Sequence, residues 1–180
     1  NILTGATIVA GDAIIGLASD GLHTNGYSLA RQLLFETAGW NVETQVPELS
    51  ASVGEALLAP HRSYVTPTFK VMETSNVKGM AHITGGGLKD NLPRTLPDGL
   101  GARITRNSWP ELPIFNVLQS IGDNIETDEM FQVFNMGIGM VIVVPAVHAA
   151  QAQETLQEAG EKAYIIGEVV PDTNNEIHIV

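Results

Sequence analysis

The sequence predicts an α+β fold (an α/β sandwich) in which a mixed β-sheet is covered by helices. Three observations favour this class. Short apolar runs alternate along the chain with segments of helical periodicity, and glycines, prolines and other turn residues separate them. The 180 residues are enough for one domain with a substantial core. Because no repeat, low-complexity tract or charge block divides the sequence, residues 1–180 are expected to form a single domain.

Strands are expected where a short apolar run is bounded by turn residues. The run at residues 13–18 lies between Asp12 and Ser19 and is typical of a buried strand. Residues 140–144 are continuously apolar, which indicates a central strand covered on both faces. The other strands are expected at residues 79–84, 102–105, 164–170 and 177–180.

Helices are expected where apolar residues recur every three or four positions. The segment 28–37 has this pattern, and Gly39 follows it as a C-terminal glycine. Thr127 is expected to cap a helix at 128–134, which has two acidic residues in its first turn. The other helices are expected at residues 53–58, 67–73, 114–121 and 146–159, with a short one ending near residue 92.

The composition excludes several classes of protein. Nine Lys and Arg against 20 Asp and Glu give a net charge of −11, which disfavours a nucleic-acid partner. The absence of Cys excludes disulfides, thiolate metal sites and a cysteine nucleophile, and it fits a cytoplasmic location. The longest apolar run, 140–145, is too short to span a membrane. Charged residues make up only 16%, which suggests that a partner covers part of the surface.

The first of three glycine-bearing corners follows the expected strand 13–18. Gly21 and Gly26 allow positive φ angles or the close approach of a ligand. His23 and Asn25 lie between them, just before a helix N-terminus whose free N–H groups favour an anion. The alternative is that Asn25 only caps the helix and that His23 packs in the core.

The second corner contains three consecutive glycines at the start of a short helix. Successive backbone N–H groups in such a turn can hold phosphate oxygens, although the segment matches neither the Walker A nor the dinucleotide pattern. Lys89 and Arg94 follow closely and are candidate phosphate neighbours. The alternative is a tight turn with solvated charges. The candidate ligand-binding residues of this corner are His82, Thr84, Gly85, Gly86 and Gly87.

The third corner, residues 134–140, precedes the most apolar strand. Asn135 offers a side-chain amide there, and Gly137 permits close backbone approach, although a β-bulge would use the same residues. The remaining histidines form no metal-ligand pattern, so no metal site is expected within the chain. A serine hydrolase is not supported, because the sequence has no Gly-x-Ser-x-Gly motif.

The amino-acid sequences of these corners resemble those of one enzyme family. The matching segments, in order, are GLHTNGYSLAR (21–31), LLAPHRSYV (57–65), HITGGGLKDNLPRTLPDGLGA (82–102), FNMGIGM (134–140) and IGEVV (166–170). This pattern is similar to the C-terminal domain of the phosphoribosylformylglycinamidine cyclo-ligases, or AIR synthetases, over residues 9–180. One departure is His61, where the family usually has threonine, so the resemblance assigns His61 no role.

The resemblance implies an ATP-dependent ring closure in purine biosynthesis, which converts formylglycinamidine ribonucleotide to 5-aminoimidazole ribonucleotide. ATP would activate the formamide oxygen, and the amidine nitrogen would attack the formyl carbon. The family's N-terminal domain carries the ATP and Mg²⁺ sites and the main homodimer contacts. Since the sequence starts at Asn1 and has no Met before Met72, it is expected to be one domain of a longer protein, inactive alone.

The resemblance also assigns roles to residues in the three corners. His23 and His82 would lie near the reacting groups as proton carriers or hydrogen-bond donors. The expected substrate-binding residues are Asn25, Gly26, Thr84, Gly85, Gly86, Gly87, Asn135 and Gly137. The three corners are expected to line one concave pocket. Two alternatives stay open: an amidotransferase or kinase domain of the wider superfamily, and a non-catalytic ligand-binding module.

Overall fold

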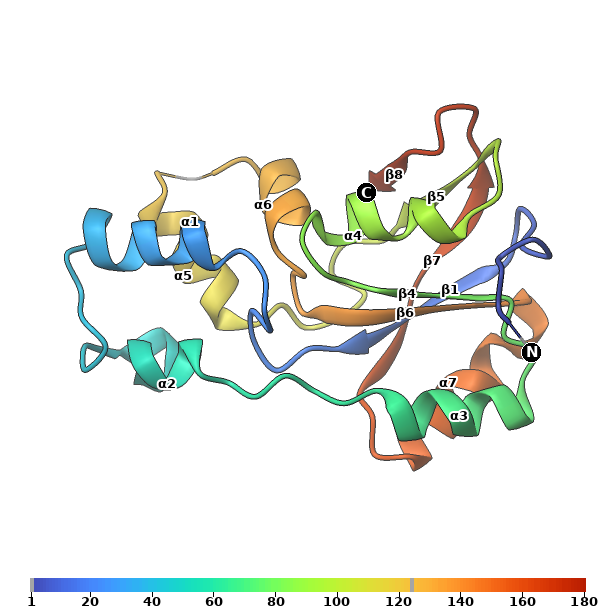
Figure 1. Cartoon of the computed structure of the whole chain (residues 1–180), viewed down its shortest axis with the longest axis horizontal. Helices are drawn as coiled ribbons and strands as arrows, with labels where there is room; N and C mark the ends of the chain where they lie inside the picture. The colour runs from blue at the N-terminus through green and yellow to red at the C-terminus, as the bar shows by residue number, and fades with distance from the viewer. Residues whose placement is uncertain (1, 124) are drawn as a thin grey trace.

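A computed structural model describes residues 2–123 and 125–180, and its main feature is a six-stranded mixed sheet (Figure 1). The strand order is β4-β6-β1-β7-β5-β8, and every neighbouring pair is antiparallel except β5 and β8. The strands of this sheet are β1 (Ala13–Ala18), β4 (Gly79–His82), β5 (Leu100–Ile104), β6 (Ile138–Val144), β7 (Ala163–Pro171) and β8 (Ile177–Ile179). A separate hairpin pairs β2 (Gln45–Val46) with β3 (Ala51–Ser52).

Helices cover both faces of the sheet. The α-helices are α1 (Tyr27–Arg31), α2 (Val53–Leu57), α3 (Val65–Thr74), α4 (Gly87–Asn91), α5 (Pro113–Ile121), α6 (Thr127–Val133) and α7 (Ala149–Glu158). The π-helix η1 (Gln32–Thr37) continues α1, and short 3₁₀ turns lie at η2 (Pro47–Leu49), η3 (Pro93–Thr95) and η4 (Ala146–His148). Across the described part of the chain, no helix has the length and apolar character that a membrane span requires.

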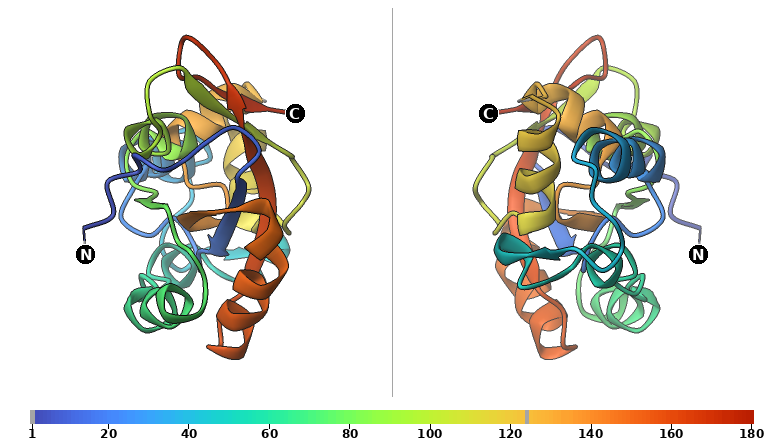
Figure 2. Two further views of the ribbon diagram at one scale, coloured as in Figure 1. Left: turned by 90° about the vertical axis from the view of Figure 1, so that its right-hand side faces the viewer. Right: turned by 90° about the vertical axis from the view of Figure 1, so that its left-hand side faces the viewer.

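The core consists of two hydrophobic layers, one on each face of the sheet. Helices α3 and α7 lie side by side on one face, and the remaining helices gather on the other face and beyond one end of the sheet (Figures 1 and 2). Strand β1 contributes to both layers, with Ile14 in the larger and Ile15 and Leu17 in the smaller. Because both faces of β1 are covered, all six of its residues are buried, which explains its continuous apolar sequence.

Antiparallel pairing brings three chain segments to the same end of the sheet. Strand β6 begins where β1 and β4 end, with Ile138 opposite Ala18 and Met140 opposite His82. The register of β1 shifts between Leu17 and Ala18, which is a β-bulge. The loops that contain the three glycine-bearing corners therefore start from adjacent strand ends.

The fold class predicted from the sequence is confirmed, and most elements lie within a few residues of their expected positions. Thr127 is wrongly expected to be a cap: the N-cap of α6 is Glu126, it makes no side-chain cap hydrogen bond, and Thr127 is the first helical residue. The hairpin β2–β3 is not predicted, because two-residue strands are too short to show an alternating pattern.

Helix α2 begins with a capping box, a signal that the sequence contains as Ser-x-x-Glu. The Ser52 hydroxyl accepts a hydrogen bond from the Glu55 backbone N–H at 3.3 Å, and the Glu55 carboxylate accepts one from the Ser52 N–H at 2.8 Å. The Ser52 hydroxyl also donates to the Glu55 carboxylate at 2.8 Å. The bonds that the carboxylate accepts from the Ser52 N–H and from this hydroxyl lower the pKa of Glu55.

Replacement of Ser52 by alanine is therefore expected to destabilise the fold by about 1 kcal/mol. The measurement is the midpoint of urea unfolding followed by far-ultraviolet circular dichroism. Ser63→Ala is the control, because Ser63 is exposed in a loop and should leave the midpoint unchanged. Equal midpoints for Ser52→Ala and the unmodified chain would contradict the assigned cap.

Candidate functional site

The side chain of Asn135 joins the end of β1 to the start of β6. Its Oδ1 accepts hydrogen bonds from the Ser19 hydroxyl at 2.9 Å and the Gly137 N–H at 2.8 Å. Its Nδ2 donates to the Gly21 carbonyl at 2.9 Å. Asn135 is only 1% exposed, and both polar atoms of its amide are used within the chain. The observed contacts make it a positioning residue that fixes the first and third corners relative to each other.

The glycine triplet lies against the same corner. Gly87 packs so closely on helix α6 that a Cβ atom there would overlap the carbonyl oxygen of Phe131. Gly26 packs equally closely on the ring of Phe134. A Cβ atom built on Gly85 would lie 3.9 Å from Asn25 Oδ1. The first, second and third corners are therefore neighbours in space, as the sequence predicts.

Asn91 braces the glycine triplet, a role that sequence reasoning missed. Its Nδ2 donates to the carbonyl oxygens of Gly87 at 2.8 Å and Gly85 at 3.1 Å, and its Oδ1 accepts from the Thr84 hydroxyl at 3.0 Å. Within residues 2–123 and 125–180, the N–H groups of Gly85 and Gly86 have no hydrogen-bond acceptor. Asn91 thus holds the carbonyls inward and leaves these two amide donors available to a ligand.

His23 is buried in the first corner as a neutral imidazole. It has a φ of 55°, is 3% exposed, and accepts a hydrogen bond at Nε2 from the Asp20 N–H at 3.2 Å. Burial and the neighbouring His61 lower the pKa of His23 to about 4. Near pH 7 the single ring proton therefore resides on Nδ1, a buried atom that has no partner among the described residues. This N–H lies beside Gly139, where an added Cβ atom would be 3.0 Å from Nδ1, so an acceptor would have to enter this packed space to reach it.

His61 and His82 complete a cluster of three imidazoles. The His61 ring stacks on His23 with the ring centroids 4.1 Å apart, and its Nε2 lies 3.2 Å from Nε2 of His82. Burial and His61 lower the pKa of His82, so the ring is neutral near pH 7. The resemblance assigns no role to His61, because the family usually has threonine there, and no local signal shows that residue 61 reaches the ends of β1 and β4.

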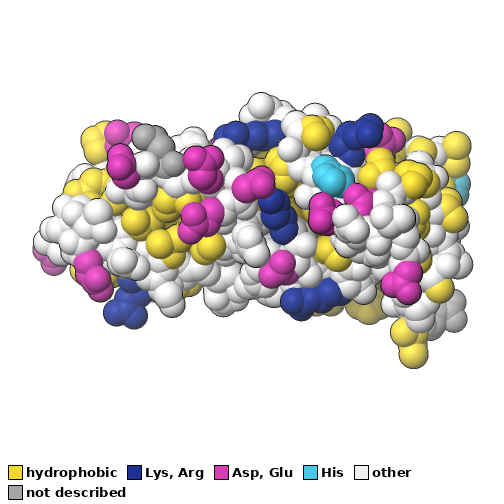
Figure 3. All heavy atoms as spheres, turned by 90° about the horizontal axis from the view of Figure 1, so that it is seen from above, with side chains coloured by type: hydrophobic (Ala, Val, Ile, Leu, Met, Phe, Trp, Pro, Cys, Tyr) yellow, Lys and Arg dark blue, Asp and Glu magenta, His cyan; other side chains and the backbone are white. Residues whose placement is uncertain are grey.

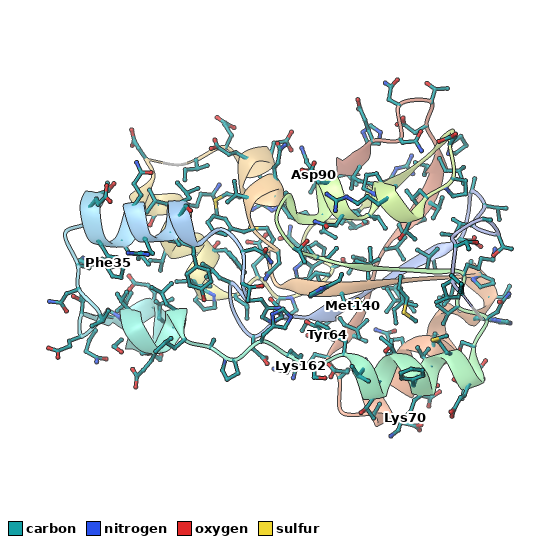
Figure 4. All side chains as sticks on the ribbon, in the orientation of Figure 1. Phe35, Tyr64, Lys70, Asp90, Met140 and Lys162 are labelled. Carbon is teal, nitrogen blue, oxygen red and sulfur yellow. The ribbon has the colours of Figure 1, made fainter. Side chains whose placement is uncertain are left out.

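Tyr64 and Gly139 fill the space behind His23. The Tyr64 hydroxyl donates to the Ala18 carbonyl at 2.8 Å, and burial raises the pKa of Tyr64. A Cβ atom on Gly139 would overlap this hydroxyl and press on the His23 ring. Figure 4 shows Tyr64 close to Met140, where the loop before α3 meets the sheet. Gly139 is thus required for the packing of the histidine as well as for the strand.

Arg62 fixes the loop that carries His61. Its guanidinium lies 3.2 Å from a carboxylate oxygen of Asp20 and 3.4 Å from one of Glu161. Glu161 is partly buried, which raises its pKa, although Arg62 opposes this effect. Two ion pairs thus tie residue 62 to the ends of β1 and β7 and hold the preceding histidine in place. Arg62 is a second site residue that sequence reasoning did not single out.

Two cavities open beside the first corner. The larger, of about 650 Å³, is mostly apolar and runs between the α1–η1 helix and α2. Its lining residues are His23, Thr24, Tyr27, Arg31, Phe35, Val42, Gly54, Leu57 and Leu58. The smaller, of about 190 Å³, begins at Asp20 and Gly21. The three corners converge, but the lining of these cavities includes neither the glycine triplet nor Asn135.

The two candidate phosphate neighbours occupy the surface around α4. Lys89 forms an ion pair with Asp128 at 2.9 Å, and Arg94 is exposed. The view from above shows Lys and Arg side chains interspersed with acidic ones (Figure 3). The Asp128 carboxylate therefore already neutralises part of the charge that a phosphate group would meet at Lys89.

No group of three or more His, Asp or Glu side chains within the described residues could hold a metal ion. The site as described therefore consists of imidazoles, backbone amides and one arginine. Three buried donors in it have no hydrogen-bond partner among the described residues: Nδ1 of His23, Nδ2 of Asn25 and Nη1 of Arg62, of which the last is ion-paired with Glu161 at 3.4 Å. Unpaired buried donors are costly unless a ligand satisfies them, which indicates a site for a ligand with several acceptor oxygens.

Comparison with known proteins gives consistent matches. The family model described as AIR synthase related protein, C-terminal domain, matches residues 9–180. The phosphoribosylformylglycinamidine cyclo-ligase of Geobacillus kaustophilus is 54% identical over 168 residues, which cover 93% of this chain and 48% of the relative. The enzyme of the same name from Bifidobacterium animalis subsp. lactis is 46% identical over 179 residues, which cover 99% of this chain and 52% of the relative. The chain thus spans about half the length of these relatives.

Solved structures match at the level of the fold. Thiamine-monophosphate kinase from Stenotrophomonas maltophilia has a TM-score of 0.61 at 14% identity, covering 95% of this chain and 50% of the kinase. The hydrogenase maturation protein HypE of E. coli has a TM-score of 0.59 at 22% identity, covering 97% of this chain and 48% of that protein. A HypE structure in complex with ATP has a TM-score of 0.52 at 22% identity, covering 93% of this chain and 44% of that protein.

Proposed function

The chain belongs to the family of AIR synthase related proteins, C-terminal domain, and from that membership we propose that it is the C-terminal half of a phosphoribosylformylglycinamidine cyclo-ligase. The proposed reaction consumes ATP and closes formylglycinamidine ribonucleotide to 5-aminoimidazole ribonucleotide. The observation that carries this proposal is the pair of unpartnered donors on His23 and Asn25 beside the free amides of the glycine triplet. These donors suit the oxygens of a phosphorylated substrate.

In the proposed reaction the formamide oxygen takes the γ-phosphoryl group of ATP and ADP is released; the amidine nitrogen then attacks the formyl carbon, and the phosphorylated oxygen leaves as inorganic phosphate. Negative charge gathers on this oxygen as its bond to carbon breaks, and the charge must be stabilised. The neutral His23 donates its Nδ1–H toward this developing charge, because its Nε2 is already engaged by the Asp20 N–H. A preorganised donor in a buried site of this kind contributes about 10²–10³ in rate. In this proposal His23 acts as an electrostatic donor, which is one of the two roles that the resemblance implies for it.

The amidine must also lose a proton as it attacks. His82 is exposed at the end of β4 and is neutral near pH 7, since its pKa is lowered. Its imidazole can therefore accept the proton. The amides of Gly85 and Gly86, with Asn25, hold the substrate in the folded-back geometry that an intramolecular attack needs. The backbone of the site is positioned by Asn135, Gly26 and Gly137, which in this proposal do not contact the substrate themselves.

The upstream half of the protein supplies the remaining parts of the proposed enzyme. We assign it the Mg²⁺ site, most of the ATP site and the homodimer contacts, and we place the enzyme in the cytoplasm. The described residues hold no group of three carboxylates or histidines that fits a metal, so no step of the mechanism on this chain passes through one. Bound with ATP, Mg²⁺ would neutralise charge on the transferred phosphoryl group.

The test compares this chain alone with a chimera in which it replaces the C-terminal half of the Geobacillus kaustophilus relative. Phosphate release from ATP is measured with formylglycinamidine ribonucleotide present. The chimera is expected to turn over at a rate within about tenfold of the intact relative, and the chain alone is expected to be inactive.

Three outcomes would change the proposal. Turnover by the chain alone, at a rate comparable to the intact relative, would refute the assignment of half the active site to another segment. A folded chimera that binds the ribonucleotide without turnover would favour a non-catalytic module. Phosphoryl transfer to thiamine monophosphate, in place of ring closure, would favour the kinase type that has the same fold.

A further inference from the structure

His61 and His82 come from different parts of the chain, and their Nε2 atoms face each other. His82 ends strand β4, and His61 lies 21 positions earlier in the loop before α3. Their Nε2 atoms are 3.2 Å apart, and both residues are exposed to solvent. The ring planes are inclined at 64°, so the two nitrogens converge edge to edge while the rings diverge.

This separation matches two ligands on one tetrahedral metal ion. Zinc binds histidine nitrogen at about 2.0–2.1 Å, and a tetrahedral angle then places two such nitrogens about 3.3 Å apart. In the absence of metal, one ring donates to the other, and a metal ion would replace the shared proton. Imidazole nitrogen is a preferred ligand of Zn²⁺, Ni²⁺ and Cu²⁺, whereas Mg²⁺ and Ca²⁺ prefer oxygen.

The backbone around both rings is held in place. His82 pairs with Met140 across the sheet, and His61 precedes Arg62, whose ion pairs reach Asp20 and Glu161. His23 stacks against the face of His61 and therefore supports the ring without reaching its Nε2 edge. Ligands held in this way lose little freedom when they bind a metal ion. The net charge of −11 further favours the approach of a cation.

We propose that His61 and His82 form a two-histidine site for a divalent transition-metal ion. The remaining coordination positions are filled by water, since His23 presents its face and no group of three or more ligands is found among the described residues. The affinity is expected to follow the order Cu²⁺ > Ni²⁺, with Cu²⁺ also tighter than Zn²⁺. This inference concerns binding by the 180-residue chain and stands independently of the proposed enzyme activity.

The test is calorimetric titration of the chain with Zn²⁺, followed by His61→Thr and His82→Thr. The unmodified chain is expected to bind one Zn²⁺, and each variant is expected to bind it about 100-fold more weakly. The matched control is His178→Gln, which removes a histidine from β8, away from the pair, and should leave the affinity unchanged. Mg²⁺ at the same concentrations should give no heat of binding.

A second measurement does not depend on the variants. One equivalent of Cu²⁺ added to the unmodified chain should give an electron paramagnetic resonance spectrum with splitting from two imidazole nitrogens. The proposal is overturned if the Cu²⁺ spectrum shows no nitrogen ligands. It is equally overturned if folded His61→Thr binds Zn²⁺ as tightly as the unmodified chain, or if His178→Gln abolishes binding.

Discussion

His23→Ala, introduced into the chimera, is expected to lower turnover by a factor of about 100 or more while the affinity for the ribonucleotide changes far less. The alanine removes the Nδ1–H donor, and removal of one such donor from a buried, preorganised site costs about 10²–10³ in rate. The measurement is the rate of phosphate release at saturating ATP and ribonucleotide. A loss below threefold would remove His23 from the mechanism.

His23→Asn separates a hydrogen-bond donor from a proton carrier. Asparagine tolerates the left-handed backbone conformation at this position, where φ is 55°, and its side-chain amide can place an N–H close to the position of Nδ1. If His23 acts as a donor, His23→Asn should retain at least about tenfold more activity than His23→Ala. If it carries a proton, the two variants should be equally impaired, at a loss of about a hundredfold, because an amide does not titrate.

The same substitution has a consequence for stability against pH. Burial holds the pKa of His23 at about 4 in the folded chain against 6.5 in the unfolded chain, so the unfolded chain binds more protons between these pH values. Stability from this group is fully present above pH 6.5 and is lost as the pH falls through 4, by at most about 3 kcal/mol. In urea unfolding, His23→Asn should show a shallower decline over this window. An unchanged decline would contradict the neutral, buried state.

Much of the fold could be predicted because two of its central strands, β1 and β6, are buried on both faces. The run 13–18 is apolar throughout since helices cover both sides of β1, and the same holds for most of β6. The glycine corners were also recognisable, because Gly26 and Gly87 adopt positive φ angles against other backbone and ring atoms. Glycine loses more conformational entropy on folding than other residues, so glycines that recur at strand ends indicate a turn or a close contact there.

The site itself depends on contacts that the sequence does not show. His61 and Arg62 reach the first corner only because the loop before α3 passes the ends of β1 and β7, some 40 to 100 residues away along the chain. The neutral state of His23 follows from burial and from its neighbour His61, which are both properties of the folded chain. Asn135 was singled out as a ligand-binding amide, but its partners on the β1 side lie 114 and 116 residues away.

Gly139→Ala is expected to destabilise the fold by about 3 kcal/mol. The new methyl group would overlap the Tyr64 hydroxyl and press on the His23 ring, so it combines the strain of an overfilled core with the loss of the bond from Tyr64 to the Ala18 carbonyl. The measurement is the free energy of unfolding in urea. The control is Gly11→Ala, where a Cβ atom meets no atom within 4 Å and only its φ of 88° imposes a cost.

A second substitution distinguishes this clash from a general intolerance of the strand. Tyr64→Phe removes the oxygen that a Cβ at residue 139 would strike, so Gly139→Ala combined with Tyr64→Phe should be less destabilised than the sum of the two single changes. The expected coupling is about 1 kcal/mol or more, since residues in contact commonly interact by 0.5–3 kcal/mol. Rescue should be partial, because His23 still contacts the new methyl group. Strictly additive changes in the free energy of unfolding would show that the packing of Tyr64 does not require Gly139. They would contradict the inference that Tyr64 and Gly139 together hold His23 in the corner.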